Sequence, residues 1–236
     1  MDCPRCAAPM TAQALVAHNG RALTIDICQP CQSIWFDTRE SVALAPASTL
    51  TLFRLIGERT ARPAPTAAEL AKCPRCHGRL RLTRDMQRNT RFEYLACPNG
   101  HGRLTTFLEF LKEKQFVRAL TAPQLAELRA TVQTVNCSNC GAAVNVAASS
   151  ACDHCGSPLT MLDMSQAQAL VEQLQKADRS GQPIDPALPL NLERARRQTE
   201  AAFTGLVRDG SFLDDIASTD LVSAGLLAFS RWLAKG

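Results

Sequence analysis

Cysteine pairs constrain this 236-residue sequence more than any other feature. Eleven cysteines occur, and all but Cys97 form Cys-x-x-Cys pairs, at Cys3/Cys6, Cys28/Cys31, Cys73/Cys76, Cys137/Cys140 and Cys152/Cys155. Such a turn directs two thiolates at one ion, and a hairpin that brings a second turn alongside completes the tetrahedral shell that zinc prefers. The spacing therefore predicts three zinc ribbons, which are short antiparallel hairpins with cysteine knuckles.

The spacing also assigns the ligands. The first and third ribbons are predicted to use four cysteines each: Cys3, Cys6, Cys28 and Cys31, and then Cys137, Cys140, Cys152 and Cys155. The second ribbon has Cys73, Cys76 and Cys97, and His101 is the predicted fourth ligand. His77 competes with it, but its ring would have to fold back onto an ion that Cys76 already binds. We therefore expect three zinc ions as cofactors.

Three other interpretations of the cysteines are weaker. Free thiols or redox pairs do not explain five Cys-x-x-Cys knuckles in one chain. A c-type haem on Cys73, Cys76 and His77, with Met86 as axial ligand, needs export and leaves Cys97 without a role. Residues 1–10 lack the basic start and apolar run of a secretory signal, so a cytoplasmic location and metal ligation are favoured over disulfides. Each predicted ligand set is closed by protein, so we expect no enzymatic activity and no small-molecule substrate.

The first ribbon has further motifs. Asn19-Gly20 predicts a hairpin turn between strands at 15–17 and 22–27, and apolar periodicity predicts a helix that extends to Glu58. Trp35 and Phe36 are expected to pack between the second knuckle and this helix. The order of motifs over residues 1–45 is Cys3-Pro-Arg-Cys6, Met10, the hairpin, Ile27, Cys28-Gln-Pro-Cys31, Ile34-Trp-Phe-Asp37 and Glu40.

This order resembles the transcription-factor-IIB-type zinc ribbon family of bacterial proteins. The chain departs from the family pattern in two places: Gln32-Ser33 follow the second knuckle where the family has glycine, and Phe36 replaces leucine. The resemblance implies nucleic-acid binding and a role associated with transcription. Two further ribbons follow the part of the chain that it covers.

Composition shifts divide the rest of the chain. Proline within residues 62–66 predicts an extended linker, and residues 104–134 have helical apolar spacing with a Thr121/Gln124 capping box. Further helices are predicted from Asp163 or Ser165 to Lys176, at 191–208 and at 219–234. The predicted class is a small metal-stabilised α+β fold, in which helices join three ribbons. Its parts are a first ribbon and helix (1–60), a linker (61–71), a second, basic ribbon and helix (72–120), a helical spacer (121–135), a short third ribbon (136–160) and a helical C-terminal region (161–236).

Charge is concentrated in the middle of the chain. Residues 61–135 carry 13 basic and 6 acidic groups, whereas residues 1–60 carry five of each. The nucleic-acid-binding candidates lie here: Arg75, Arg79, Arg81, Arg84, Arg88 and Arg91 for phosphate, with Phe92 and Tyr94 beside them as base-stacking rings. Lys72 and Arg103 add to this charge. In the competing interpretation the arginines form a solvated surface or receive an acidic segment of another protein, while the rings fill the core of the ribbon.

The C-terminal helix is unusually apolar. Its uncharged interval, between Asp220 and Arg231, is far shorter than the ~20 residues that span a bilayer, so membrane binding is not favoured. The helix either packs on the helix before it or docks a partner protein. An alternative function is therefore a scaffold or adaptor that docks through residues 216–236.

Overall fold

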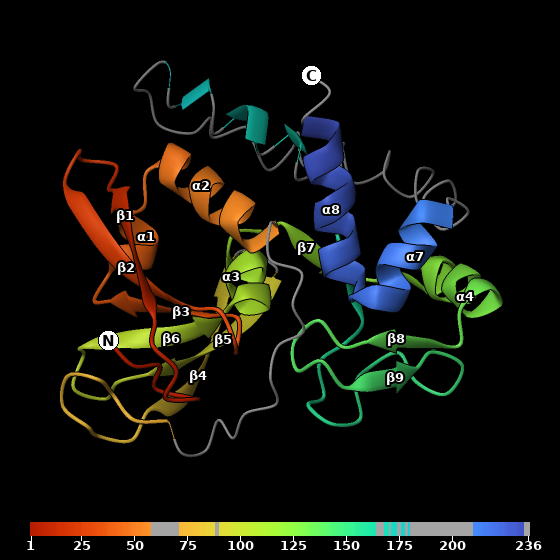
Figure 1. Cartoon of the computed structure of the whole chain (residues 1–236), viewed down its shortest axis with the longest axis horizontal. Coiled ribbons are helices and arrows are strands. Elements are labelled where there is room, and N and C mark those ends of the chain that lie inside the picture. Colours follow the sequence, from red (N-terminus) through yellow and green to blue (C-terminus); the bar gives the residue numbers. More distant parts are fainter. Residues whose placement is uncertain are drawn as a thin grey trace. The chain divides into compact units, whose positions relative to one another are not determined.

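The computed structural model describes residues 1–57, 71–87, 90–163 and 210–233, together with residues 168–169, 171–173, 176–177 and 179. The chain divides into two compact units, shown in Figure 1. Unit 1 comprises Met1–Phe53 and Ala61–Lys114, and unit 2 comprises Arg54–Thr60 and Gln115–Gly236. The result is a small α+β protein. Apart from Ala71, the predicted linker lies outside the described residues.

Unit 1 is built around one six-stranded antiparallel sheet (Figure 1). The first ribbon supplies β1 (Thr11–Val16), β2 (Ala22–Cys28) and β3 (Ser33–Asp37), and the second supplies β4 (Arg81–Gln87), β5 (Thr90–Ala96) and β6 (Gly102–Thr106). The strand order is β1-β2-β3-β6-β5-β4, with Trp35 opposite Leu104. The sequence placed these ribbons in separate parts of the chain, but the structure joins them in one sheet. The third strand of each ribbon would otherwise leave an unpaired edge, and the β3–β6 pair removes both edges.

The two faces of this sheet have different partners. Phe36, Tyr94 and Arg103 share one face, which α3 (Phe107–Glu113) covers, and the rings of Phe36 and Phe110 stack with centroids 5.8 Å apart. Trp35, Leu104 and Leu95 share the opposite face and pack against the cysteine knuckles, Met10 and Leu80. The knuckles therefore act as the second layer of the core on that face.

The helices at residues 40–57 differ from those predicted. The expected single helix to Glu58 is broken into α1 (Glu40–Ala43) and α2 (Pro46–Gly57), because Pro46 disfavours helical backbone in the residue before it. Ser48 in α2 accepts a hydrogen bond from the Val16 N–H at 2.9 Å and donates to the Val16 carbonyl at 2.8 Å, which fixes α2 at the end of β1.

The prediction that residues 104–134 are helical is wrong in part. Leu104 lies in β6, and a strand, β7 (Val117–Ala119), separates α3 from α4 (Ala122–Thr131). Thr106 caps α3 by accepting the Glu109 N–H, and Gln115 has a left-handed φ of 64° shortly after its end. The Thr121/Gln124 capping box is present at the start of α4. Helical spacing of apolar residues continued across these breaks because short buried strands are also apolar.

Unit 2 combines two small sheets with helices. β7 pairs with β10 (Thr160–Leu162), and β8 (Thr134–Asn136) pairs with β9 (Ala143–Asn145). α7 (Gly210–Ser218) and α8 (Leu221–Leu233) contribute Phe212, Ile216, Leu221 and Ala224 to a core that also contains Val135, Val144 and Met161. α8 packs closely on β10 at Gly225, where an added Cβ would lie 2.8 Å from Leu162 Cβ.

The C-terminal predictions have mixed outcomes. The helix predicted at 219–234 corresponds to α8, whereas α7 was not predicted. Helical backbone occurs at the described positions between 168 and 177, and the predicted helix at 191–208 lies outside the described residues. Among the described residues, no helix combines the length and the apolar character needed to cross a membrane.

Candidate metal centres

The cysteine knuckles share one backbone turn. In four of the five pairs, the first cysteine donates its N–H to a carbonyl five residues on, at 2.8 Å: Cys3 to Ala8, Cys73 to Gly78, Cys137 to Ala142 and Cys152 to Ser157. The residue that follows the second cysteine returns an N–H to the first and has positive φ, from 57° to 74°, at Ala7, His77, Gly141 and Gly156. Ala7 and His77 adopt this positive φ although they carry side chains. The turn directs both thiols of a pair to one side.

These turns bring the twelve predicted ligands together in three groups. Centre 1 contains Cys3, Cys6, Cys28 and Cys31, centre 2 contains Cys73, Cys76, Cys97 and His101, and centre 3 contains Cys137, Cys140, Cys152 and Cys155. Within each group the donor atoms lie within 4.8 Å of one another. In centre 1, the Cys3–Cys31 and Cys6–Cys28 sulfurs are both 3.4 Å apart. Sulfurs at ~2.3 Å from a tetrahedral ion would be about 3.8 Å apart, so the groups fit three metal ions.

Centre 2 includes a histidine, and that residue is His101. Its Nδ1 lies 3.8 Å from Cys73 Sγ and 3.5 Å from Cys97 Sγ, while Cys76 Sγ lies 3.6 Å from Cys97 Sγ. His77 is exposed and is not in the group. Asn99 Nδ2 donates to Cys76 Sγ at 3.5 Å, and the Arg75 N–H donates to Cys73 Sγ at 3.4 Å. Such donors hold thiolates in place and stabilise their charge.

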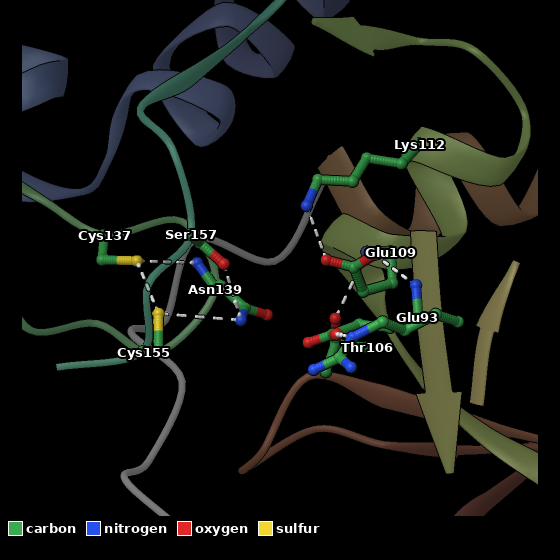
Figure 2. Close-up of polar contacts among 9 residues, drawn as sticks. Glu93, Thr106, Glu109, Lys112, Cys137, Asn139, Cys155 and Ser157 are labelled. Carbon is green, nitrogen blue, oxygen red and sulfur yellow. Dashed lines mark hydrogen bonds and ion pairs between the residues drawn. The ribbon is translucent and has the colours of Figure 1, made fainter. Parts of the chain in front are cut away.

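Centre 3 lies in the third ribbon, whose strands β8 and β9 have three residues each. Cys137 Sγ lies 3.6 Å from Cys155 Sγ, and Cys140 Sγ lies 3.7 Å from Cys152 Sγ. Asn139 connects its two knuckles: the backbone N–H donates to Cys137 Sγ at 3.4 Å, and Nδ2 donates to Cys155 Sγ at 3.8 Å and to Ser157 Oγ at 3.1 Å (Figure 2). Sequence reasoning missed Asn139, because an amide between two cysteines carries no pattern of its own.

Electrostatics within the groups favours a shared cation. A hydrogen bond from Cys31 lowers the pKa of Cys3 to about 5, and one from Cys137 lowers the pKa of Cys155 to about 4. Burial raises the pKa of Cys28 to about 12, and the hydrogen bond to Cys155 together with burial raises the pKa of Cys137. One thiolate in a group thus opposes ionisation of its neighbours. A divalent ion removes this opposition, which allows all the thiols to ionise.

The arginine candidates have different surroundings. Arg79, Arg81, Arg84 and Arg91 are exposed, and β4 forms one edge of the sheet in the described part of unit 1. Arg84 Nε lies 3.7 Å from a Glu93 carboxylate oxygen. Arg75 differs, because its Nη2 donates to Asp37 Oδ2 at 2.8 Å. Arg88 lies outside the described residues.

The aromatic candidates do not form an exposed pair. Phe92 is 6% exposed, and its ring centroid lies 6.0 Å from that of Tyr94. The guanidinium of Arg103 lies over the Tyr94 ring, 4.4 Å from its centroid. Phe92 therefore fills the core, which fits the competing interpretation better than base stacking. Trp35 and Phe36 are also buried, as expected for core residues.

Arg103 belongs to a buried charge cluster and not to the basic surface. Its Nη2 lies 2.6 Å from Glu113 Oε2, and Lys114 Nζ lies 3.2 Å from Glu113 Oε1. Nearby, the buried Glu109 carboxylate accepts from Lys112 Nζ at 2.6 Å and from the Glu93 N–H at 2.8 Å (Figure 2). Glu109 and Glu113 interrupt the apolar run 107–114, and this pattern could have indicated buried ion pairs. They tie α3 to the sheet.

Comparisons with known proteins give no match: no protein-family model, curated protein or solved structure is similar to this chain. The resemblance of residues 1–45 to the transcription-factor-IIB-type ribbons stays a prediction from its motifs.

Proposed function

We propose that this protein is a non-enzymatic zinc protein with three structural ions. The supporting observation is that each of the three groups offers four protein donors, either four sulfurs or three sulfurs and one nitrogen. Structural zinc sites are closed in this way, whereas catalytic ones keep a position for water. Elemental analysis of protein purified under reducing conditions should find three zinc equivalents per chain. Iron at a similar level would contradict the assignment, since four thiolates also suit iron.

The ions hold the fold that presents a nucleic-acid-binding surface. Together with the resemblance of residues 1–45 to transcription-factor-IIB-type ribbons, this surface supports a role associated with transcription. The observation that carries this proposal is the exposed β4–β5 hairpin, where Arg81, Arg84 and Arg91 extend into solvent. Guanidinium groups bind phosphate through paired donors, and the attraction is long-ranged. Because Phe92 is buried and Arg103 covers Tyr94, the contact is with the phosphate backbone and not with stacked bases. Binding with little sequence preference is expected.

Charge reversal tests this surface. For the Arg81→Glu/Arg84→Glu variant, the slope of log affinity against log salt should fall by about 2 relative to the unchanged protein, measured by fluorescence anisotropy with duplex DNA. The matched control is Arg21→Glu/Arg39→Glu, which reverses two exposed arginines of the first ribbon and should leave the slope unchanged. Absence of binding by the unchanged protein at low salt would remove the proposal, as would an equal effect of both variants.

A scaffold or adaptor role is the second candidate, and one observation favours it. Leu82 and Met86 in β4 are 53% and 58% exposed and lie on the same face of the strand as Arg84. Exposed apolar side chains of this size favour contact with protein. A Leu82→Asp/Met86→Asp variant that loses a partner in affinity purification, with nuclease treatment having no effect, would support it over nucleic-acid binding.

Part of the predicted docking segment, residues 216–236, is buried in the core of unit 2 and is not free to bind a partner. Leu221, Val222 and Leu226 are buried. Asp220 accepts the hydroxyl of Ser138, which lies inside a knuckle of centre 3. Docking through the remainder of this segment stays a prediction, as does a cytoplasmic location.

A further inference from the structure

The sheet of unit 1 connects two metal centres end to end. β3 begins two residues after Cys31 of centre 1, and β6 begins directly after His101 of centre 2. The two strands pair antiparallel over five residue pairs, from Ser33 opposite Thr106 to Asp37 opposite Gly102. Since they run in opposite directions, each strand leaves its own centre and ends beside the other one.

Residues at the end of β3 contact both knuckles of centre 2. Asp37 Oδ2 accepts from Arg75 Nη2 at 2.8 Å, and Asp37 Oδ1 accepts from Trp35 Nε1 at 2.8 Å. The Thr38 hydroxyl donates to the Gly100 carbonyl. Arg75 lies between Cys73 and Cys76, and Gly100 lies between Cys97 and His101. The first ribbon therefore supplies contacts that hold the second ribbon's ligands.

The reverse contact occurs at the other end of the strand pair. The Phe107 N–H, just after β6, donates to the Gln32 carbonyl at 2.8 Å. Gln32 directly follows Cys31, and its φ of 47° is part of the knuckle turn. The second ribbon thus fixes the backbone next to a ligand of centre 1.

The two centres also share one buried core. Five cysteines, Cys3, Cys28, Cys31, Cys73 and Cys97, belong to a single cluster with Trp35 and Leu104. Trp35 is 1% exposed and Leu104 is 4% exposed. Opening either knuckle set would expose these side chains, and reclosing it would depend on the core that the other set holds. Such a shared element couples two binding events energetically.

We propose that centres 1 and 2 bind and lose metal as one cooperative pair, whereas centre 3 loads independently. Centre 3 belongs to unit 2, which has its own core. The inference rests on the proposed function in one respect, which is that the three groups hold ions. It adds that metal supply controls the folding of both ribbons of unit 1 in one step.

Removing ligands from one centre gives the direct test. Native mass spectrometry of the full-length Cys28→Ser/Cys31→Ser variant should show one bound ion, because centre 2 is lost together with centre 1. The matched control, Cys137→Ser/Cys140→Ser, should retain two ions. Alkylation of released cysteines, mapped by peptide mass spectrometry, identifies the empty centre. Two ions in the first variant, with Cys73, Cys76 and Cys97 protected, would overturn the inference. Fewer than three ions in the unchanged protein would instead refute the proposed function.

A second variant leaves all twelve ligands in place. A Cβ at Gly102 would lie 2.4 Å from the Phe36 carbonyl oxygen and 2.8 Å from Trp35 Cζ2, so Gly102→Ala separates β3 from β6. In a chelator titration of the unchanged protein, cysteines of centres 1 and 2 should become reactive together. In Gly102→Ala, centre 2 should release its metal separately from centre 1, at a chelator concentration lower by on the order of 10-fold. Centre 3 should not change and serves as the internal control for folding.

Gly20→Ala controls for backbone strain alone. Gly102 and Gly20 both have positive φ, at 149° and 78°, but a Cβ at Gly20 would have no heavy atom within 4 Å. This variant should not shift release from centre 2. Separate release of metal from centres 1 and 2 in the unchanged protein would contradict the proposed coupling, as would joint release in Gly102→Ala.

Discussion

At the scale of single residues, Glu113 shows how unit 1 balances buried charge. Its carboxylate accepts from Arg103 Nη2 at 2.6 Å, from the Ser41 hydroxyl and from Lys114, so α1, β6 and the end of α3 meet at one group. Burial lowers the pKa of Lys114, and the neighbouring carboxylate opposes this shift. Without Glu113, two cations would face each other in a site that excludes water.

We expect Glu113→Leu to destabilise unit 1 by about 3–5 kcal/mol, which is the usual effect of removing one partner from a buried ion pair. Urea denaturation of the zinc-loaded protein measures this, followed by Trp35 fluorescence in a Trp232→Phe background so that only unit 1 is observed. Arg84→Ala is the control: its ion pair with Glu93 is exposed, and its loss should cost less than about 1 kcal/mol. If both variants lowered the free energy of unfolding by the same amount, the buried cluster would contribute no more than an exposed ion pair.

The predictability of the site also differs residue by residue. The metal ligands were accessible from the sequence because each knuckle is a local turn, and cysteine spacing reports it directly. His101 could be preferred over His77 because of local geometry alone. The partner of Arg75 could not be predicted, since Asp37 reaches it from a distant part of the chain. The surroundings of Arg103 depend on how β5 and α3 pack beside it, which no local pattern reports.

At the scale of elements, local signals identified the hairpins and missed the long-range pairing. Asn19-Gly20 places the turn between β1 and β2. β2 lies close to its predicted position, whereas β1 begins at Thr11, four residues before the predicted start. β3 was not predicted, because its sequence Ser-Ile-Trp-Phe-Asp does not alternate: its first four residues are buried. That pattern marks a strand with neighbours on both sides and both faces. Its neighbour β6 lies some 65 residues further along the chain, beyond the reach of any local pattern.

α8 illustrates how a helix start depends on one side chain. Asp220 Oδ1 accepts the N–H groups of Val222 and Ser223 at 2.9 and 3.2 Å, and Asp220 also accepts the Ser138 hydroxyl. Asp220→Ala should therefore cost about 1–2 kcal/mol and loosen both α8 and the first knuckle of centre 3. Hydrogen exchange measured by mass spectrometry should show faster exchange over residues 221–226. Unchanged exchange there would mean that packing on β10 holds the helix without its cap.

At the scale of the whole molecule, cysteine knuckles replace much of the second layer that a sheet normally requires. α3 covers one face of the unit 1 sheet, while the opposite face packs on knuckles and cysteines. Unit 2 places Cys137 and Cys152 in the same core as Val135, Val144 and Ile216. In both units the ligands are therefore core residues, and metal binding free energy contributes to folding free energy.

Chelation should unfold both units as a consequence. Four thiols without an ion cannot all ionise: burial raises the pKa of Cys28, and the hydrogen bond with Cys155 together with burial raises the pKa of Cys137. The knuckles therefore separate and expose the apolar residues behind them. With excess EDTA and a reducing agent, we expect loss of near-ultraviolet circular dichroism, reactivity of all eleven cysteines and, in the Trp232→Phe background, a red shift of Trp35 emission. Re-adding three equivalents of zinc should reverse these changes, whereas magnesium, which prefers oxygen ligands, should not. A chain that keeps its native spectrum and protected cysteines in EDTA would show that apolar packing alone holds the two cores, and the structural role assigned to the ions would be wrong.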